Sequence, residues 1–216
     1  MSTQLGELRD RIYRLVGDPA EEGYSPEIVI DGIVAAHDAI LPWVPKTGQD
    51  SFTGDGSATA FAVPSDVYAL EAIIVDSTGE TIPPAIFSPG NYWGSTTVNS
   101  NDWIEYPSGY VTFSKAIASN ATYSVFYAAR WGVPDLTSQD TFVLEPPDYV
   151  MVGMAYYAAA YAILPSAVSV SEIRQFGTRV DSGNPEHNPM QRASEYLLKL
   201  FAAEMNRHPK HQRPQR

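Results

Sequence analysis

Apolar residues recur at helical spacing near the start of the chain. Within residues 3–16 they form one stripe, and charged side chains fill most of the other positions; the stripe consists of Leu5, Leu8, Ile12 and Leu15. This pattern predicts an amphipathic helix, with Ser2 or Thr3 as its N-cap. Gly17 and Pro19 follow directly and should end it.

A second helix is predicted over residues 26–41. Ser25 can cap it, and Pro26 suits its first turn because the missing N–H has no partner there in any case. One face of this helix is apolar and should meet a core; it carries Val29, Ile33, Ala36 and Ile40.

From about residue 50 the apolar period changes from the helical one to two, which is typical of strands. Residues 52–61 predict two short strands joined by a Gly54-Asp55-Gly56 hairpin turn. Turn signals at short spacing separate further predicted strands at 69–76, 81–87, 103–106, 110–114 and 122–131. Such regularity indicates a small antiparallel sandwich or barrel.

Helical pattern returns after Pro146-Pro147-Asp148. Residues 149–164 carry no charge and are apolar or aromatic on every side, so we expect this helix to be surrounded by others. It would span only about 24 Å at ~1.5 Å per residue, short of a bilayer core of ~30 Å. Ser169-Val-Ser-Glu172 matches a capping box and predicts a separate short helix.

Asn188-Pro189 can cap a last helix whose apolar residues should face a core: Ala193, Tyr196, Leu197, Leu200 and Phe201. The predicted fold class is therefore α+β, because the helical segments at both ends must meet around one core. We expect a helical bundle from residues 1–48 and 146–206, with a β-rich antiparallel sandwich or barrel-like insert at 49–145. Residues 207–216 contain two prolines and no apolar side chain, which predicts a flexible basic tail.

Charge is distributed unevenly along the chain. The formal net charge is −11, but residues 207–216 hold four basic residues and no acidic one, so the other 206 residues carry ten basic and 25 acidic residues, or −15. Such a body repels phosphate backbones, which argues against sequence-specific DNA binding. The chain has no cysteine, and its first residues lack the basic and apolar segments of a secretory signal. We therefore expect synthesis in the cytoplasm.

The order of these elements, together with several local segments, resembles the head-to-tail adaptor (connector) proteins of tailed bacteriophages. The segments that carry the resemblance are Ile12-Tyr-Arg-Leu-Val-Gly-Asp-Pro19, Tyr24-Ser25, Ala39-Ile-Leu-Pro-Trp43, Phe52-Thr-Gly-Asp-Gly-Ser57 and the Ala- and Tyr-rich helix at 154–162. The resemblance spans most of the chain, and each of its motifs is structural and degenerate.

The resemblance implies a structural virion protein of the neck, made in the host cytoplasm, that has no enzymatic activity and needs no cofactor. Its copies would join into a ring, commonly a dodecamer, beneath the portal protein. The ring would extend the channel through which DNA passes and would present a platform to a downstream tail protein. A C-terminal segment often anchors such proteins to the portal, and its counterpart here supplies Arg207, His208, Lys210, His211, Arg213 and Arg216.

Other candidate sites have plainer interpretations. Gly54-Asp55-Gly56 is similar to the start of a calcium loop but lacks its later ligands, and His208 and His211 have no second ligand pair for a metal. Glu186-His187 lies between turn-forming prolines. We predict no metal site.

Two functional alternatives remain beside the adaptor. One is a carbohydrate- or host-binding β module carried on a helical base. Tyr92 and Trp93 lie in a polar, glycine-bearing loop and would be interface anchors if exposed. These two residues are equally compatible with a tail-facing interface and with a satellite of the β core. A glycosidase would need two facing carboxylates, for which the candidates are Glu71, Asp76, Glu80, Asp102 and Glu105. The chain has no nucleophile-elbow, phosphate-loop or dinucleotide motif.

Overall fold

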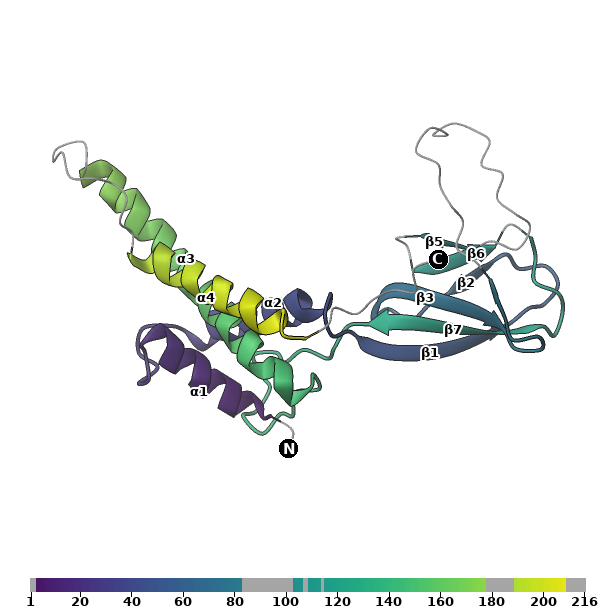
Figure 1. The fold of residues 1–216 in the computed structure, drawn as a ribbon, viewed down its shortest axis with the longest axis horizontal. Coiled ribbons are helices and arrows are strands. Elements are labelled where there is room, and N and C mark those ends of the chain that lie inside the picture. Colours follow the sequence, from purple (N-terminus) through teal and green to yellow (C-terminus); the bar gives the residue numbers. More distant parts are fainter. Residues whose placement is uncertain (1–2, 83–102, 107–108, 114, 178–188, 209–216) are drawn as a thin grey trace. The chain divides into compact units, whose positions relative to one another are not determined.

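The structure, a computed structural model, describes residues 3–82, 103–106, 109–113, 115–177 and 189–208. The chain is mixed α+β and divides into two compact units. As far as they are described, residues 3–44 and 131–208 form the helical unit, and residues 45–130 form the β unit. Figure 1 shows both, coloured along the sequence.

Helix α1, Leu5–Val16, has the predicted apolar stripe but a different start. Leu5, Leu8 and Ile12 are buried, and Gly17 ends the helix with a left-handed φ of 77°. The predicted N-cap is wrong at Thr3, because the cap position is Gln4 and Thr3 turns to Asp148 instead. Ser2 lies outside the described residues.

Backbone carbonyls from a distant segment satisfy the first N–H groups of α1. Leu5 donates to the Phe142 carbonyl at 2.8 Å and Gly6 donates to the Asp140 carbonyl at 3.0 Å. The Arg9 guanidinium also pairs with the Asp140 carboxylate at 2.6 Å. A helix start needs acceptors for its free N–H groups, and here the segment 140–144 supplies two of them beside a capping box between Gln4 and Glu7.

Helix α2, Pro26–Ile40, forms as its sequence predicts. Ser25 Oγ accepts the Ile28 N–H at 3.5 Å, and Pro26 takes the first turn. The predicted apolar face is completely buried at Val29, Ile33, Ala36 and Ile40.

A 3-10 turn, Asp148–Val150, leads into the long helix α3, Met151–Gly177. The prediction of two helices here is wrong, since α3 continues through Pro165 and past Ser169. Pro165 removes one helical hydrogen bond because it has no N–H, but the helix does not end there. Ser169 and Glu172 match the sequence of a capping box, but both lie inside α3 and do not begin a new helix. Serine is tolerated at such an interior position.

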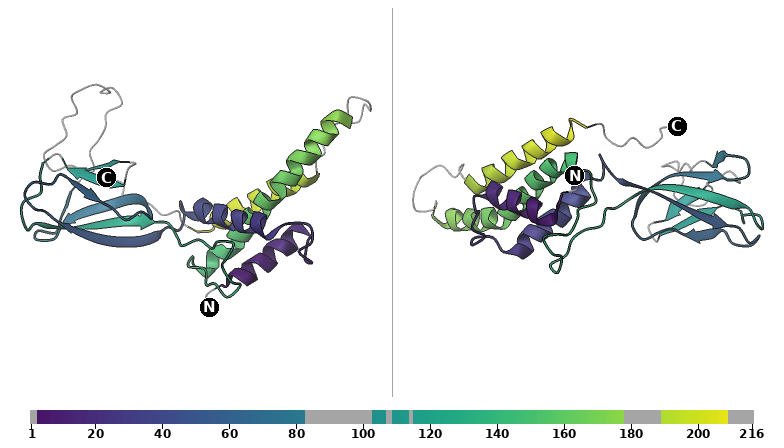
Figure 2. Two further views of the ribbon diagram at one scale, coloured as in Figure 1. Left: turned by 180° about the vertical axis from the view of Figure 1, so that it is seen from behind. Right: turned by 90° about the horizontal axis from the view of Figure 1, so that it is seen from below.

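The other three helices pack around α3. The last of them, α4, is Pro189–Met205 and begins at the predicted proline. Leu197, Phe201 and Met205 of α4 are buried, whereas Tyr196, predicted to face the core, is 62% exposed. The helices form one hydrophobic cluster, with Met154, Ala155, Ala158 and Ala159 of α3 fully buried within it. In the right view of Figure 2, α3 lies between α2 and α4.

The described part of the β unit contains two antiparallel sheets. One has the strand order β1-β7-β3-β4 and the other β2-β6-β5. Their bounds are β1 Lys46–Thr53, β2 Ala60–Ala62, β3 Val67–Val75, β4 Glu80–Ile82, β5 Trp103–Tyr106, β6 Tyr110–Phe113 and β7 Thr122–Ala129. Each sheet has two edge strands in the described part of the chain, so the sheets do not close into the predicted barrel.

The predicted hairpin at residues 52–61 is wrong. β1 pairs with β7 and β2 pairs with β6, so the Gly54-Asp55-Gly56 segment connects two different sheets. Asp55 Oδ1 accepts the backbone N–H groups of Ser57 and Ala58 at 2.8 and 2.7 Å, which holds the loop in an Asx-type turn. A Cβ on Gly54 would lie 2.5 Å from the Ala118 carbonyl, so the loop needs glycine there.

Aromatic side chains from both sheets meet in the core of the β unit. The Phe52 ring of β1 stacks on Phe61 of β2 with centroids 4.3 Å apart. It also contacts Phe113 of β6 and Tyr123 of β7, each at 5.6 Å. Both sheets therefore bury side chains in one hydrophobic cluster.

The chain passes from the helical unit to the β unit between residues 44 and 45 and returns between residues 130 and 131. The sequence had predicted an insert at 49–145. Trp131 donates its indole N–H to the Val44 carbonyl at 2.7 Å, within the helical unit. Two residues further on each side, Lys46 pairs with Ala129 in the sheet. Residues 131–145 belong with the helices because they carry Trp131, Phe142 and Leu144 into that core.

Helix α2 approaches α3 closely at Gly32. A Cβ at this position would lie 2.8 Å from the Ala158 carbonyl oxygen, which belongs to the α3 backbone and has little freedom to move. We expect Gly32→Ala to lower the free energy of unfolding by about 1–3 kcal/mol through overpacking. Alanine has a higher helix propensity than glycine, which by itself would stabilise α2. A loss of stability would therefore come from the overpacking.

Urea unfolding followed by helical circular dichroism measures this effect. The exposed neighbour on the same helix, Asp31→Ala, is the control and should shift stability by less than about 0.5 kcal/mol. Equal midpoints for Gly32→Ala and the parent protein would show that α2 and α3 are not held at this distance.

Candidate functional site

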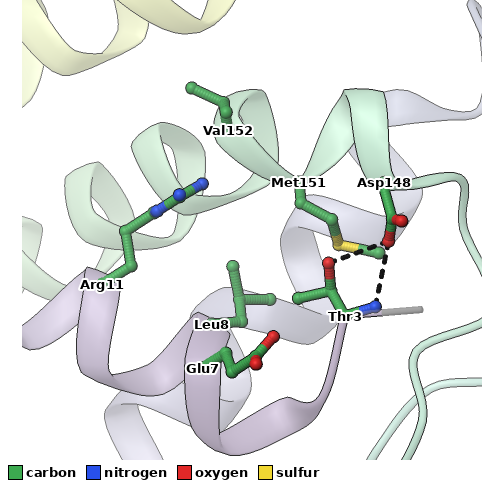
Figure 3. A pocket seen from close by; sticks show the side chains of 7 residues that line it. All are labelled: Thr3, Glu7, Leu8, Arg11, Asp148, Met151 and Val152. Atoms are coloured by element: carbon green, nitrogen blue, oxygen red, sulfur yellow. Dashed lines mark hydrogen bonds between the residues drawn. The ribbon is translucent and has the colours of Figure 1, made fainter. Parts of the chain in front are cut away.

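The described residues form a small pocket where the start of α1 meets the start of α3, shown in Figure 3. Its volume is about 200 Å³, enough for a side chain or a few waters. The residues that line it are Thr3, Glu7, Leu8, Arg11, Asp148, Met151 and Val152. Leu8 and Met151 are buried and make its floor apolar, whereas Glu7 and Arg11 are exposed.

Asp148 is the polar anchor of the pocket. Its Oδ1 accepts both the backbone N–H and the hydroxyl of Thr3, each at 2.9 Å. The Thr3 hydroxyl bond is the main reason that the pKa of Asp148 lies below its ordinary value. An ionised carboxylate that already accepts two bonds from its own chain joins residue 3 to the start of α3, which is a structural role.

The C-terminal residues predicted to bind a partner are described in part. Arg207 forms an ion pair with Glu204 at 2.7 Å, and His208 lies against the Tyr149 ring with centroids 4.6 Å apart. Their backbone N–H groups donate to the carbonyls of Glu204 and Met205. The flexible tail predicted to start at 207 therefore has its first two residues bonded to the end of α4, and His208 also packs on Tyr149. Lys210, His211, Arg213 and Arg216 lie outside the described residues.

Several other predicted site residues also fall outside the described part of the chain: Tyr92, Trp93, Asp102, Glu186 and His187. Of the candidate glycosidase carboxylates, Asp76 and Glu80 flank the exposed turn between β3 and β4, and Glu71 lies within β3. The described residues contain no cluster of three His, Cys, Asp or Glu side chains suited to a metal ion. No described helix is long and apolar enough to cross a membrane.

His37 is a buried titratable residue that the sequence analysis did not single out. Its side chain is 2% exposed, and its Nδ1 lies 2.8 Å from the Ile33 carbonyl, to which it can donate in the Nδ1–H tautomer. Position 37 follows Ile33 by one helical turn and lies beside the apolar stripe, so the period of α2 could have placed it inside. Burial is the main cause that lowers its pKa, against smaller opposing effects of the Ile33 bond, Asp38 and Glu145.

No protein-family model matches the chain, and no curated protein matches it.

The lowered pKa of His37 predicts how stability changes with pH. The unfolded chain, with an ordinary histidine pKa of about 6.5, takes up the proton more readily than the folded chain. The stabilisation from the neutral imidazole is therefore complete above that pH and is lost as pH falls below it. Between pH 7.5 and 5.5 the parent protein should lose more unfolding free energy than His37→Gln.

Urea unfolding at both pH values measures the two losses. The comparison uses the change with pH within each protein, so a packing defect caused by glutamine cancels. Equal losses in the two proteins would mean that His37 titrates alike in the folded and unfolded chains.

Proposed function

We propose that this protein is a ring-forming head-to-tail adaptor of a tailed bacteriophage, a structural virion protein that docks on the portal in the neck. One observation carries the proposal: helices from both ends of the chain pack around α3, with the β unit inserted between α2 and α3. This is the arrangement of elements on which the family resemblance rests. Within it, the helices would form the bundle of the ring and the two sheets a sandwich that reaches the tail protein.

The charge distribution supports a channel through which DNA passes. Residues 1–44 and 131–206 hold seven basic and 17 acidic side chains. A ring wall of this sign repels phosphates and would let a polyanion slide without binding.

The basic residues beyond His208 supply a portal anchor. Residues 209–216 carry Lys210, Arg213 and Arg216 and no acidic residue. A basic segment gains charge-assisted hydrogen bonds when it docks in an acidic cleft, which offsets the conformational entropy that it loses.

The decisive experiment mixes the purified protein with portal rings encoded in the same genome. Native mass spectrometry and electron microscopy should find one added ring of this protein, with about twelve copies expected from the resemblance. A monomer in the absence of the portal is compatible with the proposal, because the portal can act as the template. Portal rings that gain no mass at any protein concentration would overturn the adaptor function.

Removal of residues 209–216 should abolish ring addition and leave the fold unchanged. The truncation ends after His208, so it keeps the Arg207–Glu204 ion pair and the contact between His208 and Tyr149. The matched control keeps the length of the tail and replaces only Gln212 and Gln215 by alanine, and it should still add a ring. Undiminished ring addition by the truncated protein would move the portal anchor to another surface.

A further inference from the structure

The outward face of α2 carries an acidic stripe. Glu27, Asp31 and Asp38 are exposed and lie within about 40° of one another around the helix, at ~100° per residue. Helix α2 contains no lysine or arginine, and neither Glu27 nor Asp31 forms an ion pair within the described chain. The half-buried side chain of Val34 lies on the same face between Asp31 and Asp38.

The outward face of α4 has the opposite character. Arg192, Tyr196 and Lys199 are exposed and lie within about 60° of one another around this helix. Tyr196 is 62% exposed and is placed between the two basic residues. The acidic residue nearby, Glu195, accepts a hydrogen bond from Gln191 at 2.9 Å.

The two faces match in spacing as well as in sign. On α2 the carboxylates of Asp31 and Asp38 are seven residues apart, and on α4 Arg192 and Lys199 are also seven residues apart. Seven residues correspond to about 10 Å along a helix. Val34 lies three residues after Asp31, and Tyr196 lies four residues after Arg192. Two ion pairs and the contact between Val34 and Tyr196 can therefore form together, with the helices parallel or antiparallel.

The two faces point away from each other within one molecule. Helix α2 contacts α3 at Ala158 through Gly32, whereas α4 contacts α3 at Gly153 and Ala160. Around the axis of α3, Gly153 and Ala160 lie about 140° and 160° from Ala158. The right view of Figure 2 shows α2 and α4 on opposite sides of α3. A copy bound at one face therefore leaves the other face open for the next copy.

We infer that the outward face of α2 docks on the outward face of α4 of a second copy, with Tyr196 against Val34 and the acidic pair against the basic pair. A contact between two different faces repeats from copy to copy, and it closes into a ring where the rotation between neighbours is a whole fraction of a turn, which the portal ring would impose as a template. Tyr196 becomes buried in this contact and supplies the apolar anchor, and the charges at both ends fix the register. The inference rests on the proposed function and names its subunit contact.

Charge reversal tests the pairing in either helix orientation. Asp31→Lys with Asp38→Lys, or Arg192→Glu with Lys199→Glu, should each raise the protein concentration for half-maximal ring addition to portal rings at least about tenfold, because like charges then face each other. The four substitutions together restore opposite charges and should return this concentration to within about threefold of the parent value.

The control reverses two exposed carboxylates elsewhere on the helical unit, Asp10→Lys with Glu22→Lys, for the same change in net charge as the double variant of α2. Circular dichroism verifies the fold of each variant, and the single changes Asp31→Lys and Lys199→Glu replace any double variant that unfolds. Parent rings that form while the reversals behave like the control would overturn the contact and leave the adaptor function standing. A combined variant as weak as the doubles would also overturn it. Parent protein that adds no ring would remove both proposals.

Discussion

The burial of α3 is the constraint on which the rest of the helical unit depends. Its first part has no charged side chain, and small residues there leave no room between helices: Gly153 faces Met205 and Phe201 of α4, and Ala158 faces Gly32 of α2. A helix that is apolar all round needs neighbours over most of its surface, and this part of α3 has them except near Tyr161 and Leu164, which are exposed. The chain meets this need with helices from both of its ends, and the β unit consequently leaves and re-enters the helical unit between α2 and α3.

The return of the chain from the β unit is as important as the helices themselves. Residues 131–145 run back along the core, where Trp131 bonds the Val44 carbonyl and the carbonyls of Asp140 and Phe142 accept from the start of α1. Helix α1 has only 12 residues, a length that is marginal for an isolated helix in water. It therefore depends on this segment for its first hydrogen bonds and on α3 for its apolar stripe, which joins both ends of the chain in one cooperative structure.

The sequence predicted the features that depend on local period and local turn chemistry. The apolar face of α2, its Ser25 cap, the uncharged helix and the start of α4 at Pro189 are confirmed, because each rests on residues a few positions apart. The errors involve partners far along the chain. The β1 partner is β7 and not β2, the first two N–H groups of α1 donate to Phe142 and Asp140, and Ser169 lies inside a helix whose course no local signal indicated.

The candidate site was harder to predict for the same reason. Asp148 and Thr3 are 145 positions apart, and only the packing of α1 on α3 brings them within 2.9 Å. The basic character of residues 207–216 could be read directly, but the ion pair of Arg207 and the ring contact of His208 depend on the fold. Tyr196 was placed on the core face together with Leu197, but consecutive helical residues are about 100° apart, and α4 buries Leu197 while it exposes Tyr196.

The charge of the helical unit also bears on how copies could associate. With 17 acidic and seven basic residues in 1–44 and 131–206, two copies repel each other at long range. At physiological ionic strength this repulsion is screened over about 8 Å, so the groups in direct contact decide whether two faces bind. The basic pair and Tyr196 on α4 are a local exception to the acidic surface. If the proposed contact forms, a weak attraction opposed by the total charge would favour a monomer in dilute solution and assembly where a template concentrates the copies.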